Sequence, residues 1–225
     1  MKHSVSELFD VVYQYFPRGQ WIEKPGYPRW PTLLHPPKSA SSERYRDWPY
    51  QAWPPPGYDD TEEQHRLNAA SIKAGADPET WRVILRRIDA RLPGYVAENG
   101  SLHLPVGGYG ACYTGWIDLP LREPREILYG LRFLVSFVVP YYVVHSCASV
   151  NYTDERGKPI LDNMLDFSPD EKPCVPVIVE ELRAAFAGYE PMPPEIGNLV
   201  VPEAVTHFKM MGEATIYGCL FTPYW

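Results

Sequence analysis

The chain lacks the motifs by which the common enzyme classes are recognised. It contains no H-E-x-x-H zinc motif and no G-x-S-x-G nucleophile elbow. The glycine cluster at 107–110 lacks the third glycine of a dinucleotide loop, and no Gly-Lys-Ser/Thr follows it. The cysteines are four dispersed residues without a C-x-x-C pair, Cys112, Cys147, Cys174 and Cys219. This spacing does not indicate a zinc site or a disulfide-stapled domain, so we expect neither a metal nor a cofactor.

Basic residues are also scarce. The chain has 21 Lys and Arg against 28 Asp and Glu, a formal net charge of −7. Nucleic-acid binders normally present a basic patch to phosphates, so we expect no nucleic-acid partner. The first residues, MKHSVSELFDVV, carry Glu7 and Asp10 where a secretory signal needs an apolar core. Together with the dispersed cysteines, this predicts a cytoplasmic protein with reduced thiols.

The longest apolar tract is FLVSFVVPYYVVHSCASV, residues 133–150. A membrane-spanning helix needs about 20 consecutive apolar residues, whereas Pro140 and His145 interrupt this tract. Its paired valines favour a strand, and a short uncharged run is typical of a strand covered on both faces. We therefore predict a central strand at 140–149 and no membrane association.

The remaining pattern predicts an α+β fold, with helices packed on a mostly antiparallel sheet in a single domain, residues 1–225. Helical spacing and capping signals predict the helices 5–16, 61–74, 78–92, 124–137 and 175–187. Alternating or short apolar runs predict a hairpin at 101–119 and strands at 198–201 and 214–221. Residues 151–173 are predicted to be a polar connection. Residues 17–60 should form an extended Pro/Trp-rich arm packed on the domain, because ten of the 25 prolines and four tryptophans precede residue 61.

One pair of residues suggests thiol chemistry. If Gly107-Gly108 form the hairpin turn, His103 lies directly opposite Cys112 on the neighbouring strand. An imidazole beside a thiol raises the thiolate fraction that a nucleophilic cysteine needs, and Asp118 would orient the histidine only if the strand bends. A chance pairing on a half-buried sheet face is the competing interpretation and the favoured one.

Acidic residues form two groups that indicate a protein-binding surface. The first group lies in the predicted loop 151–171 and comprises Asp154, Glu155, Asp162, Asp166, Asp170 and Glu171. The second includes Asp59 and Asp60, just before a predicted helix whose dipole alone would also favour negative charge. A negative surface speeds association with a basic partner, although a solvated loop explains the first group equally well.

Two stretches, VVPYYVVHS at 138–146 and GEATIYGCLF at 212–221, resemble core strands of bacterial immunity proteins encoded beside polymorphic toxins. The resemblance implies a cytoplasmic, non-enzymatic protein that neutralises its cognate toxin by direct binding. No functional residue is transferred by it, because the resemblance concerns core strands only. Two alternatives stay open: a thiol-dependent hydrolase that uses Cys112 and His103, and a structural subunit of a bacterial assembly. The sequence leaves the oligomeric state undetermined.

Overall fold

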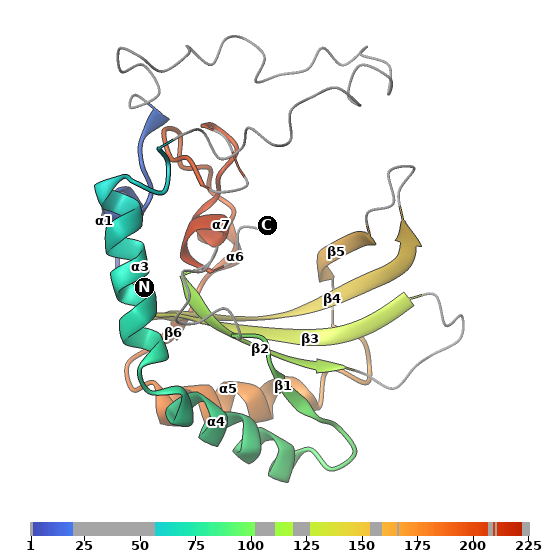
Figure 1. Ribbon diagram of the computed structural model, residues 1–225. Helices are drawn as coiled ribbons and strands as arrows, with labels where there is room; N and C mark the ends of the chain where they lie inside the picture. The colour runs from blue at the N-terminus through green and yellow to red at the C-terminus, as the bar shows by residue number, and fades with distance from the viewer. Residues whose placement is uncertain are drawn as a thin grey trace.

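A computed structural model describes residues 2–19, 57–101, 111–118, 127–153, 159–165, 167–206, 209 and 211–221. These residues form one α+β domain around a six-stranded sheet (Figure 1). Neighbouring strands follow the order β1-β2-β3-β4-β5 and pair antiparallel, while the short β6 pairs parallel with β4. The predicted fold class is therefore confirmed.

Three helices begin where their capping residues predict. Helix α1 (Val5–Tyr15) starts with a capping box in which Ser4 and Glu7 satisfy each other's backbone N–H groups. Helices α3 (Glu62–Gly75) and α4 (Pro78–Arg91) are capped by the side chains of Thr61 and Asp77. These local signals are independent of tertiary packing, which is why sequence analysis locates the three helices.

The sheet is built from six strands: β1 (Ala97–Asn99), β2 (Cys112–Asp118), β3 (Ile127–Ser136), β4 (Tyr141–Thr153), β5 (Pro159–Leu165) and β6 (Glu190–Pro191). The predicted central strand at 140–149 is β4, which directly follows Pro140 and is longer than predicted. Its outer edge pairs with β5 along its C-terminal half and with β6 at Tyr141 and Tyr142.

The helix predicted at 124–137 is wrong, because residues 127–136 form strand β3. Leu131, Phe133 and Val135 are all buried on one side of the sheet, while Leu134 is buried on the other. Apolar residues at successive positions satisfy a helical period as readily as a strand covered on both faces. The tertiary environment decides here, since β3 lies between β2 and β4.

The polar connection predicted at 151–173 is also partly wrong. Strand β4 continues to Thr153, and β5 occupies Pro159–Leu165 and pairs back onto β4 with two irregularities in register. Polar residues such as Asn151 and Asp162 therefore belong to an edge hairpin, where one face of an antiparallel pair tolerates polar side chains. Helix α5 (Cys174–Ala185) follows, close to the predicted 175–187.

The C-terminal strand predicted at 214–221 is a short helix, α7 (Ile216–Leu220), capped by the Thr215 side chain. All five of its residues are buried, so the sequence shows no alternation of polar and apolar residues with a helical period. A fully apolar run of this length is equally typical of an inner strand. The strand predicted at 198–201 is reduced to one bridge between Val200 and Thr215, after the unpredicted helix α6 (Pro194–Gly197).

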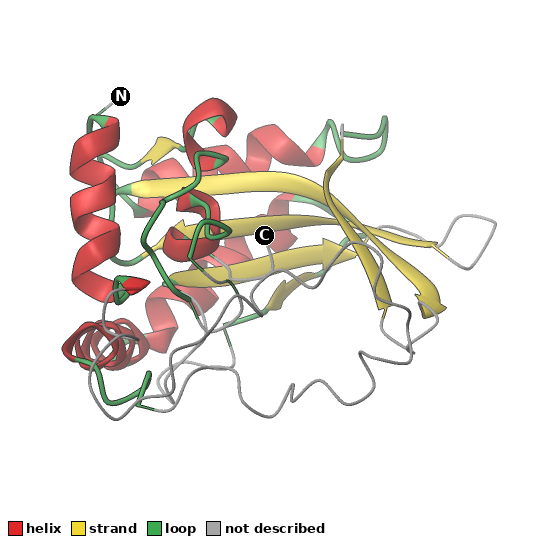
Figure 2. Ribbon diagram, turned by 90° about the horizontal axis from the view of Figure 1, so that it is seen from above, coloured by secondary structure: helices red, strands yellow, loops and turns green. Residues whose placement is uncertain are grey.

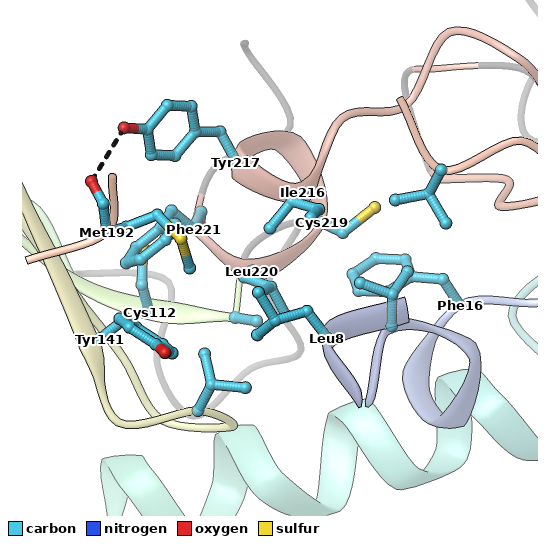
Figure 3. Packing of buried hydrophobic residues seen from close by; sticks show 14 of the residues in the cluster. Leu8, Phe16, Cys112, Tyr141, Met192, Ile216, Tyr217, Cys219, Leu220 and Phe221 are labelled. Atoms are coloured by element: carbon cyan, nitrogen blue, oxygen red, sulfur yellow. Dashed lines mark hydrogen bonds between the residues drawn. The ribbon is translucent and has the colours of Figure 1, made fainter. Parts of the chain in front are cut away.

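Two apolar clusters cover the two faces of the sheet unequally. Helices α4 and α5 cover the lower face in Figure 1, where Trp81 and Ile178 pack with Phe133. On the upper face, α1 and α7 form a second cluster with Cys112, Leu134, Tyr141 and Val143, part of which Figure 3 shows. Seen from above, the described helices of this side gather over one end of the strands (Figure 2).

Most of the predicted arm at 17–60 lies outside the described residues, but both of its described ends contact the same segment. Arg18 and Ala204 form an isolated antiparallel β-bridge, and the Val205 amide donates to the Pro17 carbonyl at 3.0 Å. Tyr58 is 1% exposed and donates its hydroxyl to the Val205 carbonyl at 3.2 Å. The two ends therefore meet at Val205.

Candidate functional site

The upper face carries polar side chains at the end of the sheet away from α1 and α7. Strand register places Glu98 opposite Trp116, Trp116 opposite Arg132, and Arg132 opposite His145. These four residues form a row across β1, β2, β3 and β4, which we call the cross-strand row. Because side chains alternate between faces along a strand, the row lies on the same face as the buried Leu134. We call this end of the face the polar half.

Trp116 is held in the row by a hydrogen bond from its indole Nε1 to Glu98 Oε2 at 3.1 Å. The indole is partly buried, and its single N–H donor is fully used by this bond. Asp118 follows on the same face of β2 and is exposed. Burial and the nearby Glu98 charge raise the pKa of Asp118, while Arg132 opposes the rise. Glu98 and Asp118 therefore place two carboxyl groups on the β1–β2 side of the polar half.

Arg132 is the unusual member of the row. It is partly buried on the central strand β3, and no carboxylate of the described residues lies within 4.0 Å of its guanidinium. The Cys147 thiol lies beside it: burial raises the pKa of that thiol, and the neighbouring Arg132 partly offsets the effect. A partly desolvated guanidinium is normally paired, so the site carries a charge that the described chain does not neutralise.

His145 closes the row on β4 and is 4% exposed. Burial lowers its pKa to about 4, and the nearby Arg132 adds to the decrease, against a backbone hydrogen bond with Ser146 that raises it. The Nδ1 atom lies 3.1 Å from the Ser146 carbonyl oxygen. At neutral pH the ring is therefore uncharged, which leaves Arg132 as the cation of the row.

Gly130 keeps the space between Asp118 and Cys147 free of a side chain. Register places Gly130 between these two residues on the neighbouring strands. A Cβ atom at this position would lie 2.9 Å from the Ile117 carbonyl oxygen, so a larger residue would push the strands apart. The Cys147 thiol instead donates to the Gly130 carbonyl at 3.4 Å.

Cys112 has none of the properties of an activated nucleophile. It is 1% exposed, and its thiol donates to the Phe221 carbonyl oxygen at 2.8 Å. Burial raises its pKa to about 12, the opposite of the lowering that a catalytic thiolate requires. Its cross-strand neighbour on β3 is Ser136. The proposed partner His103 lies outside the described residues.

Glu171 is not a surface residue, which corrects its assignment to an acidic interface. It is completely buried: Ser146 Oγ donates to its Oε1 at 2.7 Å, and the Ser168 amide donates to its Oε2 at 2.6 Å. Its backbone carbonyl also accepts from the Cys174 amide at the start of α5. Glu171 therefore joins the turn before α5 to strand β4 and has a structural role.

The other acidic candidates of that segment are placed unevenly. Asp170 is partly buried in the turn before α5. Asp162 lies on β5, opposite Ala148, and the structure describes only its backbone. Asp154, Glu155 and Asp166 lie outside the described residues.

Asp59 and Asp60 are exposed just before α3, as the sequence predicts. They do not share a surface with Asp170: Figures 1 and 2 place the start of α3 and the turn before α5 at different ends of the molecule. The two acidic groups therefore form no single interface within the described chain.

Sequence analysis missed the cross-strand row because its members are 18, 16 and 13 positions apart and belong to no motif. One signal was available: Arg132 is the only charged residue between Ile127 and Thr153, inside an otherwise uncharged run. Within the described ranges, no cluster of three His, Cys, Asp or Glu residues has the arrangement of a metal site. None of the described helices has the length and apolar character needed to cross a bilayer.

Comparisons with known proteins leave the chain without an assigned family: no protein-family model, no curated protein and no solved structure matches it.

Proposed function

We propose that this protein binds a bacterial toxin in the cytoplasm and neutralises it by direct contact, as an immunity protein does. The observation that carries the proposal is the cross-strand row, in which Trp116 and Arg132 are neighbours on a sheet face. Tryptophan and arginine are among the residue types most enriched at the energetic centres of protein interfaces. Neighbouring strands of a hydrogen-bonded sheet also present both side chains on a rigid scaffold, which reduces the ordering cost of association.

Charge supports the same proposal. The net charge of −7 favours association with a basic partner, because attraction over a Debye length accelerates encounter. Glu98 and Asp118 add two carboxylates beside Trp116, so basic side chains of the toxin find acceptors at the β1–β2 side of the row. The four cysteines are free and buried, which suits a reducing compartment.

The test is the open reading frame beside the gene. We expect the toxin domain encoded there to arrest bacterial growth, and co-expression of this protein to restore it. The purified proteins should form a complex of defined stoichiometry in size-exclusion chromatography with light scattering. If the neighbouring product is toxic but is neither bound nor suppressed, the proposal is wrong.

Two sets of variants locate the contact. Trp116→Ala should abolish suppression, while Arg87→Ala, an exposed arginine on α4 under the opposite face, should leave it intact. The double variant Asp59→Asn with Asp60→Asn tests the second acidic group. Equal loss of suppression in the Arg87 control and in Trp116→Ala would show that neither effect is specific to the row. Thermal unfolding of each variant separates loss of binding from loss of folding.

A further inference from the structure

Arg132 is the only arginine of the described chain that is partly buried rather than exposed, and it lacks the carboxylate partner that most of the others have. Five of them form ion pairs with carboxylates: Arg18 with Glu203, Arg66 with Glu62, Arg82 and Arg86 with Glu79, and Arg91 with Glu180 and Glu181. Their side chains are at least 40% exposed, so solvent would hydrate them even without a partner. Arg132 has less solvent and no such carboxylate.

Among the described residues, no negatively charged group lies at ion-pair distance from Arg132. His145, its neighbour on β4, is neutral, and the Cys147 thiol stays protonated because burial raises its pKa. The Glu98 carboxylate accepts the Trp116 N–H, on the far side of the indole from Arg132 in the strand order. Burial and Glu98 raise the pKa of Asp118, and Arg132 is close enough to oppose that rise, but the two side chains form no ion pair.

We propose that Arg132 is the receptor for a carboxylate of the bound toxin. The guanidinium is planar and presents donors in the fork that a carboxylate accepts in a bidentate manner. Trp116 and His145 stand on either side of it in the row and would shield the pair from water. The inference rests on the proposed function for the identity of the partner, and it names the group that this partner inserts.

The decisive experiment measures toxin binding by isothermal titration calorimetry for the wild type and for three variants. Arg132→Met should weaken binding by at least about 30-fold, since truncating one member of a desolvated charge pair costs that much or more. The affinity of Arg132→Lys should lie between those of the wild type and Arg132→Met, because lysine keeps the charge and loses the bidentate fork. The matched control Arg87→Met removes an exposed arginine of the same charge and should bind like the wild type.

Charge exchange tests the identity of the ligand. If a carboxylate of the toxin pairs with Arg132, one acidic-to-lysine variant of the toxin will lose binding to the wild type and regain it with Arg132→Glu. Wild-type binding with no effect of Arg132→Met overturns this inference and leaves the proposed function standing. No binding of the wild type overturns the proposed function instead.

A measurement on the free protein keeps the inference testable even if the wild type does not bind the toxin. The Trp116 indole N–H gives one resonance in a nitrogen–proton correlation spectrum, assigned by its loss in Trp116→Phe. Titration with acetate at constant ionic strength should shift it saturably in the wild type and not in Arg132→Met. The absence of a saturable shift, or the same shift in both proteins, overturns the carboxylate site. A response to inorganic phosphate and none to acetate also overturns it, because the ligand would then be a phosphate.

Discussion

Leu134 and Arg132 lie two residues apart on strand β3, on the same face of the sheet, and have opposite environments. Leu134 is 1% exposed and packs in the cluster formed with α1 and α7. Arg132 lies in the row with Trp116 and His145, beyond that cluster. The comparison teaches that one sheet face serves two purposes. The apolar half packs against helices, whereas the polar half holds a partly buried charge without a carboxylate of the described residues beside it.

The largest effect is expected in the apolar half. Leu134→Ala should lower the free energy of unfolding by about 3 kcal/mol, because it removes buried methyl groups and leaves a cavity. Urea denaturation at constant pH measures the change. The control Leu199→Ala, at a leucine 37% exposed, should stay within about 0.5 kcal/mol of the wild type. If Leu134→Ala destabilises the protein no more than Leu199→Ala does, the cluster formed with α1 and α7 does not stabilise the sheet.

His145 should make the stability of the protein depend on pH. Burial lowers its pKa to about 4 from an ordinary 6.5, so between these values the unfolded chain binds a proton that the folded chain does not. The contribution of the neutral His145 to the free energy of unfolding is therefore fully present above pH 6.5. It is lost as the pH falls to about 4, by roughly 3 kcal/mol in total.

The check is the difference between two stability–pH profiles, one for the wild type and one for His145→Gln. Because the carboxylates are common to both proteins, their contribution cancels in the difference. The wild-type profile should be steeper between pH 4 and 6.5. Parallel profiles would mean that His145 titrates normally and is accessible to water.

The smallest change in stability is expected at Arg132 itself. Arg132→Met should alter the free energy of unfolding by less than about 1 kcal/mol, because an apolar side chain of similar length relieves the desolvation of an unpaired charge. Arg87→Met, an exposed reference, should stay within about 0.5 kcal/mol. A loss of 3 kcal/mol or more at Arg132 would instead indicate a buried ion pair within the folded chain. Chemical denaturation of both variants makes the comparison with Leu134→Ala direct.

Features that depend on near neighbours along the chain can be predicted from the amino-acid sequence alone. Ser4 with Glu7, Thr61, and Asp77 with Pro78 specify the starts of α1, α3 and α4, because caps satisfy local backbone groups. The valine-rich run after Pro140 specifies a central strand by its composition. The α+β class follows from these elements together.

Features that depend on what packs above and beside a residue are set by the assembled fold. The apolar runs at 127–136 and 216–220 satisfy both helical and strand patterns, and burial on all sides removes the polar face that would distinguish the two. Glu171 has the sequence signature of a solvated loop, yet Ser146 and Ser168 hold it in the interior. The cross-strand row exists because register aligns four strands at one level, and register is a property of the assembled sheet.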